Sequence, residues 1–207
     1  MTQYIYLVDD DEAIRLSLSA LLATMGWETK AYDSVQSFQQ GEGDLPSLSG
    51  CLLLDIRMPG KSGLALLESG LPEGFSLPVI MMTGHGNIDL CRRAFKNGAF
   101  EFLTKPVDAD LLIETVSAAL EQQRQQEQER EKFADLQAKL ATLSAREQEV
   151  MALIMQGKSN KEMAKDLNLS PRTVEAHRAS LFARLEINSL AKLINIYGGL
   201  QGPDGTT

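Results

Sequence analysis

Acidic residues follow two short apolar runs in the N-terminal half of the chain. Asp9 and Asp10 come directly after Tyr4–Val8, and Asp55 comes directly after Cys51–Leu54. An Asp carboxylate can attack phosphorus and form an acyl phosphate. The nucleophile and the incoming phosphoryl group are both negative, so a cation must offset their repulsion. Mg²⁺ suits this task because it typically takes one or two carboxylates and keeps several waters. The three carboxylates therefore predict a Mg²⁺-dependent phosphoryl acceptor, provided that the fold brings them together.

Two further polar residues follow later apolar runs. Thr83 comes after Val79–Met82, and Lys105 comes shortly after Phe100–Leu103. A Thr hydroxyl can donate to one phosphoryl oxygen, and the compact Lys ammonium can pair with another. Taken singly, each of these residues also fits a turn, a strand or a solvated loop. Their appearance at successive strand ends is what favours a site.

The elements that must position these residues alternate between short strands and helices over residues 1–120. The expected strands are Tyr4–Val8, Glu28–Tyr32, Cys51–Leu54, Val79–Met82 and Phe100–Leu103. The expected helices are Glu12–Met25, Ser34–Gln40, Ser62–Ser69, Asn87–Asn97 and one that begins at Asp108. This alternation predicts an α/β fold with a doubly wound, five-stranded parallel sheet and right-handed crossovers. Ligands bind such sheets at the carboxyl ends of the strands, where the polar residues above are found.

Composition and charge separate the two halves of the chain. A hydrophobic content of 43% is enough for a packed core. Residues 1–120 carry 8 basic against 16 acidic residues, a charge of −8, whereas residues 144–207 carry 8 against 7, a charge of +1. So small a basic excess does not by itself indicate nucleic-acid binding. Cys51 and Cys91 are expected to be structural thiols in a reducing compartment, with a redox pair as the alternative.

The start of the chain lacks the basic stretch and apolar run of a signal peptide, and no segment approaches the roughly 18 apolar residues of a membrane span. We therefore expect a cytoplasmic protein without a membrane partner.

A polar segment joins the two halves. Residues 121–132 contain neither Gly nor Pro and have high helix propensity, which predicts a helical linker over residues 121–140. Apolar residues return at Phe133, Leu136, Leu140 and Leu143. This spacing covers only about two heptads. It fits either packing onto the C-terminal domain or a dimerising helix.

The C-terminal segment, residues 141–207, is purely helical in pattern. Four serines mark the starts of four helices. Ser144 and Ser159 are each followed three residues later by a glutamate, Glu147 and Glu162, which is the pattern of a capping box. Ser170 is followed directly by Pro171, and Ser189 precedes the last helix. Four short helices predict a small all-α bundle. Helices 160–167 and 171–185 are joined by a three-residue turn, which is the spacing of a helix-turn-helix.

The helix over residues 171–185 has the pattern of a recognition helix. Its apolar residues Val174, Leu181 and Leu185 share one face, so its polar residues face elsewhere. Basic side chains there suit DNA phosphates, Glu175 can accept from cytosine N4, and Ala176 can meet a thymine methyl. A protein-binding four-helix module is the alternative. The candidate DNA-contacting residues are Lys161, Lys165, Ser170, Arg172, Thr173, Glu175, Ala176, His177, Arg178 and Ala179.

Four motifs in the first 120 residues resemble the receiver domain of bacterial response regulators, which has a flavodoxin-like fold. They are LVDDDE (7–12), LLLDIRMPG (52–60), MMTGHG (81–86) and EFLTKP (101–106). The resemblance implies that Asp55 is the phosphoacceptor, and that Asp9, Asp10, Asp55 and the backbone carbonyl of Arg57 hold Mg²⁺. Asp11 and Glu12 are then left to start the following helix, where its dipole favours them.

The same resemblance assigns the remaining polar residues. Thr83 matches the switch hydroxyl, Lys105 the phosphate-pairing lysine, and Lys105-Pro106 a peptide bond that is usually cis. Phe102 matches the rotating aromatic of the switch. Because it is Phe and not Tyr, it has no hydroxyl with which to form a hydrogen bond when it turns inward.

Residues 143–187 resemble the LuxR-type DNA-binding domain, most specifically in SNKEMA (159–164) and SPRTVEAHR (170–178). Together with the receiver, they imply an architecture like that of the FixJ subgroup of transcriptional regulators. The resemblance implies that the helix over 171–185 enters the major groove and that two copies bind a two-fold-related site. His177 then either contacts the DNA backbone or packs in the core.

The combined interpretation is a response regulator of a two-component system, with a receiver (1–120), a linker (121–140) and a DNA-binding domain (141–207). A sensor histidine kinase would phosphorylate Asp55, and phosphorylation would control DNA binding either through dimerisation or through release of the C-terminal domain. Contact with RNA polymerase is compatible with such a role. One alternative is a Mg²⁺-dependent phosphotransfer protein, against which the DNA-binding pattern counts. The other is a phosphorylation-independent DNA-binding regulator, against which the intact set of acidic residues, Thr83 and Lys105 counts.

Overall fold

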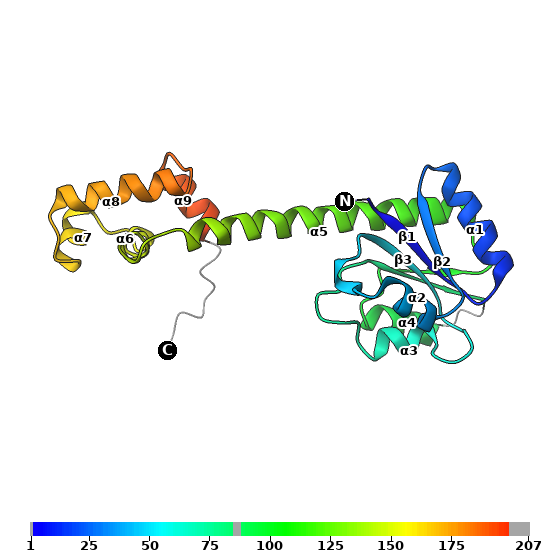
Figure 1. The fold of residues 1–207 in the computed structure, drawn as a ribbon. Helices are drawn as coiled ribbons and strands as arrows, with labels where there is room; N and C mark the ends of the chain where they lie inside the picture. Colours follow the sequence, from blue (N-terminus) through cyan, green and yellow to red (C-terminus); the bar gives the residue numbers. More distant parts are fainter. Residues whose placement is uncertain (1, 85–87, 199–207) are drawn as a thin grey trace. The chain divides into compact units, whose positions relative to one another are not determined.

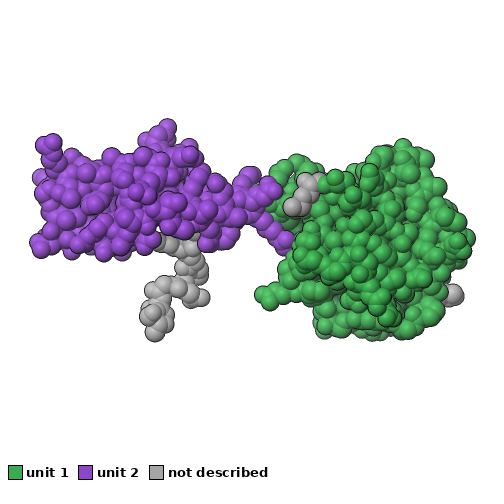
Figure 2. All heavy atoms as spheres, viewed as in Figure 1, with its two compact units in different colours: residues 1–128 green, residues 129–207 purple. Residues whose placement is uncertain are grey.

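The protein consists of two compact units, residues 1–128 and residues 129–207 (Figure 2). The structure is a computed structural model that describes residues 2–84 and 88–198. Helix α5 (Ala109–Ala141) contributes its first turns to the first unit and its last turns to the second. Each unit has its own hydrophobic core.

The first unit is built on a five-stranded parallel sheet in the order β2-β1-β3-β4-β5. The strands are β1 (Tyr4–Val8), β2 (Glu28–Tyr32), β3 (Gly50–Asp55), β4 (Val79–Thr83) and β5 (Glu101–Thr104). This strand order is that of a flavodoxin-like fold. The predicted α/β fold is therefore confirmed, with β1 and β3 as neighbours at the centre of the sheet.

Helices cover both faces of the sheet (Figure 1). Successive residues of a strand point to opposite faces, so Ile5 and Leu7 enter one hydrophobic cluster while Tyr6 and Val8 enter the other. The first cluster lies under α1 (Glu12–Thr24) and α5, and the second under α2 (Val35–Glu42), α3 (Gly63–Glu68) and α4 (Ile88–Lys96). A short 3-10 helix, η1 (Leu45–Ser47), precedes β3 and was not predicted.

The observed elements end within two residues of their predicted bounds, and the differences matter most at β3. This strand begins at Gly50 and includes Asp55 as its last residue. Gly50 adopts a φ of 130°, and a Cβ at this position would lie 1.8 Å from the carbonyl oxygen of Tyr4. Only glycine allows this close start of the pairing with β1. Asn87, the predicted first residue of a helix, lies outside the described residues.

Over the residues that the structure describes, the second unit is all-helical, as predicted. It contains the last turns of α5, then α6 (Ala145–Met155), α7 (Asn160–Asp166), α8 (Pro171–Arg184) and α9 (Leu190–Tyr197). Each of these four helices begins with a serine whose side chain accepts a hydrogen bond from a backbone N–H three residues later, and the two predicted capping boxes are present. Residues 199–207 of the predicted DNA-binding segment lie outside the described residues.

The last turns of α5 are part of the second unit's core. Leu136 and Leu140 pack against the buried cluster and Leu143 belongs to it, whereas Phe133 is 50% exposed. Lys139 Nζ also lies 2.8 Å from Glu186 Oε2. Of the two interpretations of this apolar spacing, the structure favours packing onto the C-terminal helices for all but Phe133.

Helices α7 and α8 form the predicted helix-turn-helix. The turn between them includes Asn168 at a φ of 53°, a conformation that Asn tolerates better than most residues. Val174, Leu181 and Leu185 are buried, as their spacing predicted. The opposite side of α8 is therefore the one left for a partner.

Candidate functional site

The predicted acidic residues converge at the carboxyl ends of β1 and β3. These strands are paired, with Val8 beside Leu54, so the residues that follow them meet at one edge of the sheet. Ligand oxygens of Asp9, Asp10 and Asp55 all lie within 4.8 Å of one another. Asp9 and Asp55 are buried and Asp10 is exposed, so the cluster opens to solvent on one side.

Lys105 reaches this cluster from two strands away. Its Nζ lies 2.5 Å from Asp9 Oδ2 and 3.0 Å from Asp55 Oδ2. Its backbone N–H donates to the carbonyl of Thr83 (2.7 Å), and the Lys105-Pro106 peptide bond is cis. Burial disfavours the ammonium, but the hydrogen bonds to the two carboxylates outweigh burial and raise the pKa of Lys105. The lysine is thus held as a cation against both acids.

Asp55 sits in a less favourable environment for a charge. Burial raises its pKa, and the nearby Asp9 carboxylate adds to this effect. The Lys105 ammonium and the backbone N–H of Arg57, which donates to Asp55 Oδ1 (3.2 Å), act in the opposite direction without cancelling it. Asp55 is therefore a poorly solvated carboxylate. An additional cation at this position would relieve part of that cost.

The loop that follows Asp55 is fixed by packing. Ile56 and Met58 are buried in the core, and Ser62 caps α3. Gly63, the first residue of α3, lies against the strand end: a Cβ there would be 2.1 Å from the carbonyl oxygen of Asp55. The start of α3 thus determines where the Asp55 backbone lies.

We expect Gly63→Ala to destabilise the first unit, because the added methyl group must displace the backbone of Asp55. The expected loss is about 1–3 kcal/mol, the typical range for overpacking a well-packed core. Thermal unfolding followed by circular dichroism measures it. Gly84→Ala is the control for stability, since nothing lies within 4 Å of a Cβ at that position. Equal melting temperatures for the two variants would contradict the close approach of α3 to Asp55.

Asp11, which precedes α1, and Arg15 of α1 complete the surroundings of the acidic cluster. Asp11 caps this helix by accepting from the backbone N–H groups of Ala13 (2.8 Å) and Ile14 (3.4 Å). The third acid of the run is therefore committed to the helix start. Arg15 Nη1 donates to the backbone carbonyl of Asp9 (2.7 Å). The sequence analysis did not predict a role for Arg15. Its position one turn into the helix that follows the acidic run could have indicated a contact with that run.

The predicted switch residues lie on the neighbouring strands. Thr83 is the last residue of β4 and is fully buried. Phe102 lies on β5 beside Met81 and is half-buried against the cluster under α4. Both residues are on the side of the site where β4 and β5 meet α4.

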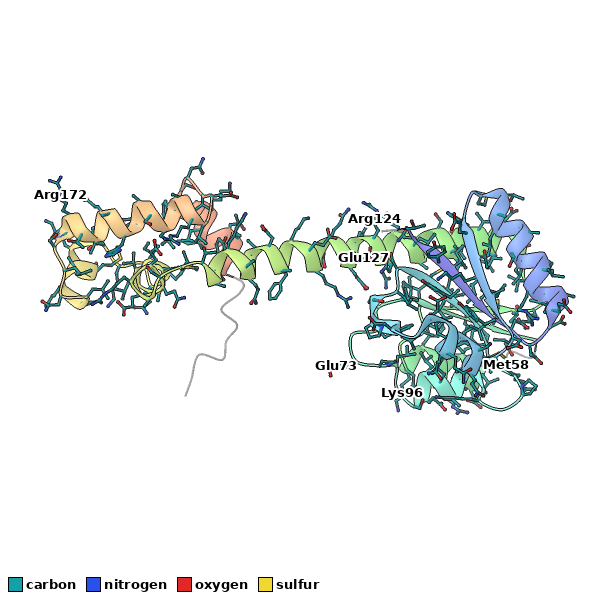
Figure 3. All side chains as sticks on the ribbon, viewed as in Figure 1. Met58, Glu73, Lys96, Arg124, Glu127 and Arg172 are labelled. Atoms are coloured by element: carbon teal, nitrogen blue, oxygen red, sulfur yellow. The ribbon has the colours of Figure 1, made fainter. Side chains whose placement is uncertain are left out.

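The predicted DNA-contacting residues of α7 and α8 differ in their exposure to solvent. The exposed ones are Lys161, Lys165, Arg172, Glu175, Ala176, Ala179 and the cap residue Ser170. Arg172 projects into solvent from the start of α8 (Figure 3). Thr173, His177 and Arg178 are half-buried. The Arg178 guanidinium donates to Asn160 Oδ1 and lies over the Phe182 ring at 5.8 Å, so it also joins α8 to α7.

Known proteins match both units. Residues 5–117 match the response regulator receiver domain family, and residues 141–197 match the family of bacterial regulatory proteins of the LuxR type. The chain belongs to the response regulators. It is a FixJ-like two-component regulator of transcription that carries a LuxR-type DNA-binding domain.

Relatives of this response regulator match it along nearly its whole length. It is 38% identical over 194 residues to the transcriptional regulatory protein FixJ of Bradyrhizobium diazoefficiens, covering 93% of each chain. It is 36% identical over 197 residues to FixJ of Rhizobium meliloti, covering 95% of this chain and 96% of the relative. The solved response regulator StyR is 34% identical, with a TM-score of 0.86 over 96% of this chain and all of that one. Among its described residues, no helix combines the length and apolar character needed to span a membrane.

In the second unit of this response regulator, Glu147 makes more contacts than its predicted capping role explains. Its capping-box role is present, since Oε2 accepts from the backbone N–H of Ser144 (2.7 Å). Its other oxygen, Oε1, accepts from Ser180 Oγ (2.5 Å) and lies 3.1 Å from Arg184 Nε. The residue is only 2% exposed. Hydrogen bonds from Ser180 and Ser144 lower the pKa of Glu147 to about 2.

The lowered pKa of Glu147 predicts a pH-dependent stability for the DNA-binding unit. Its usual value of 4.5 applies to the unfolded chain, and the folded value is about 2. The stabilisation is therefore fully present above pH 4.5 and is lost as the pH falls toward 2. In thermal unfolding of the full chain, we expect Glu147→Gln to flatten this part of the pH profile. An unchanged profile in the variant would assign the acid sensitivity to other carboxylates.

Proposed function

We propose that Asp55 is the phosphoacceptor and that Asp9, Asp10 and Asp55, with the backbone carbonyl of Arg57, bind Mg²⁺. The observation that carries this proposal is the convergence of three carboxylates within 4.8 Å, with the Lys105 ammonium hydrogen-bonded to two of them. The donor set fits the group, because carboxylate and carbonyl oxygens are what a hard divalent cation prefers. Mg²⁺ would supply the charge neutralisation that the transfer needs.

The residues of the chain divide the work of transfer. An oxygen of Asp55 forms the new bond to phosphorus while the bond to the donor's leaving group breaks, and the leaving group departs with its electron pair. The Lys105 ammonium, already 3.0 Å from Asp55 Oδ2, pairs with a phosphoryl oxygen. The Thr83 hydroxyl donates to another. Self-phosphorylation from a small phosphodonor, and slow self-dephosphorylation, follow from the same site. A sensor histidine kinase is the expected donor.

Phosphorylation is proposed to act through Thr83 and Phe102. Thr83 moves toward the phosphoryl group, Phe102 follows, and the surface over α4, β5 and α5 changes. That surface presents large exposed apolar side chains at Ile88, Phe95 and Leu111. We infer that it forms a homodimer in the phosphorylated protein, because burial of exposed apolar area favours association.

The second unit is proposed to read DNA with α8 in the major groove. Lys161, Lys165, Arg172 and Arg178 would contact phosphates, while Glu175, Ala176 and Ala179 would face base edges. Ser170, Thr173 and His177 complete the proposed contact set. We propose that the chain is divided into a receiver domain at residues 1–120, a linker at 121–140 and a DNA-binding domain at 141–207. We place the protein in the cytoplasm, with RNA polymerase as a further candidate partner.

The test is to incubate the full chain with acetyl phosphate and Mg²⁺, then record intact mass, sedimentation and DNA binding. A phosphoryl adduct that requires Mg²⁺, with dimerisation and tighter DNA binding, supports the proposal. DNA binding that is the same with and without the adduct would favour a phosphorylation-independent regulator. An adduct that passes to a second protein without any effect on DNA binding would favour a phosphotransfer protein.

A further inference from the structure

The recognition helix is held by two kinds of contact that constrain it differently. Val174, Leu181 and Leu185 bury one side of α8 in the core of the second unit. Apolar contacts are not directional, so they fix how deeply the helix sits better than they fix its rotation or its position along its own axis. Polar contacts with defined geometry are needed to fix these.

Glu147 supplies such contacts from the first turn of α6. Ser180 and Arg184 are one turn apart on α8, so they lie on the same side of the helix, and both meet Glu147 Oε1. Arg184 Nη1 also donates to the backbone carbonyl of Thr142 (2.8 Å), directly after α5. A single buried carboxylate thus joins the start of α6 to two turns of α8, and through Arg184 to the end of α5.

We propose that Glu147 is a positioning residue for DNA recognition, which sets the rotation and axial position of α8 through Ser180 and Arg184. The inference rests on the proposed contact of α8 with DNA. The groove-facing side chains lie about 5–6 Å from the helix axis, so a rotation of α8 by about 20° would displace them by about 2 Å. Such a displacement affects hydrogen bonds to base edges more than contacts to flexible phosphate-binding side chains.

The chain contains a matched control for this role. Ser159 and Glu162 form the same capping box at the start of α7, with Glu162 Oε2 accepting from Ser159 N (2.8 Å) and Ser159 Oγ (2.7 Å). Glu162 is exposed, whereas Glu147 is buried. A comparison of the two glutamates therefore separates capping a helix from positioning α8.

The experiment uses the full chain and a DNA duplex that it selects from a randomised pool, with a scrambled duplex as the non-specific probe. Ser180→Ala, Arg184→Gln and Glu147→Gln are expected to weaken binding to the selected duplex about five- to twentyfold, because each removes a charge-assisted contact. Binding to the scrambled duplex is expected to stay within about twofold. Ser180→Thr, which keeps the hydroxyl, and Glu162→Gln are expected to behave like the wild type.

Circular dichroism at the assay temperature establishes that each variant is folded. Ser180→Ala and Arg184→Gln leave the Ser144 capping box intact, so they test positioning even if Glu147→Gln unfolds. If Ser180→Ala and Arg184→Gln bind the selected duplex as tightly as the Glu162→Gln control does, the inference is overturned, while DNA binding by α8 still stands. Equal losses on the selected and scrambled duplexes would also overturn it. A wild-type chain that selects no duplex from the pool would overturn both the inference and the proposed DNA contact.

Discussion

Replacing Asp55 with Asn is expected to abolish the phosphoryl adduct completely and yet to raise the melting temperature of the first unit. The adduct is lost because the amide cannot act as the nucleophile. Stability rises because burial raises the pKa of Asp55. A carboxyl group with a raised folded-state pKa costs stability as the pH rises above its unfolded value, so a neutral side chain is favoured at neutral pH. The Lys105 ammonium, which lies 2.5 Å from Asp9 Oδ2 in the wild type, is expected to keep this partner in the variant.

Intact mass after incubation with acetyl phosphate and Mg²⁺ measures the first effect, and thermal unfolding without Mg²⁺ measures the second. Asp44→Asn is the control, since Asp44 is exposed and makes no side-chain cap. It should be phosphorylated normally and melt like the wild type. A phosphoryl adduct that persists in the Asp55→Asn variant would refute Asp55 as the acceptor. A lower melting temperature would instead refute the unfavourable burial of its charge.

Arg172→Glu is expected to weaken DNA binding by about a hundredfold, through one lost phosphate contact and one new repulsion per half-site. The slope of the logarithm of affinity against the logarithm of salt concentration should become shallower by about one unit for each half-site, because one fewer counterion is released there. The fold should not suffer. Arg172 is exposed at the second position of α8, and an acidic residue in the first turn of a helix is favoured by the helix dipole.

Fluorescence anisotropy at several salt concentrations measures both the affinity and its salt dependence. Arg146→Glu provides the matched control, because Arg146 is also exposed at the second position of a Ser-capped helix. Its substitution should leave DNA binding within about twofold, since α6 is not proposed to contact the phosphates. If both variants lose affinity equally, the effect comes from overall charge and the proposed placement of α8 is wrong.

Local features of the fold could be predicted from the sequence because their causes are local. The caps at Ser144, Ser159, Ser170 and Ser189 each involve a backbone N–H three residues away, and hydrogen bonds of that range depend on little else. The positions of β1, β3, β4 and β5 followed from short apolar runs between helical patterns, whereas β2 (ETKAY) is not such a run. Their order in the sheet followed from no local rule and entered only through the resemblance to receivers.

The sequence could not settle which acidic residues form the cluster or that Lys105 reaches it. Three consecutive acids, Asp9 to Asp11, offer the same chemistry, and the backbone decides among them: Asp11 turns into the cap of α1, while Asp9 is buried beside Asp55. Lys105 is 96 residues from Asp9 in the sequence, yet its Nζ joins Asp9 and Asp55. That contact needs β1, β3, β4 and β5 in their observed order.

The sequence by itself determined the two kinds of domain, the phosphoacceptor candidate at the end of a buried strand, and the helix-turn-helix with its caps. Only the tertiary structure decided that α3 approaches the Asp55 backbone closely at Gly63, that the last turns of α5 pack in the core of the second unit, and that Glu147 joins α6 to α8. The physical reason is the range of the interactions. Periodicity and capping act over a few residues, whereas buried contacts depend on which distant segments the folded chain brings together.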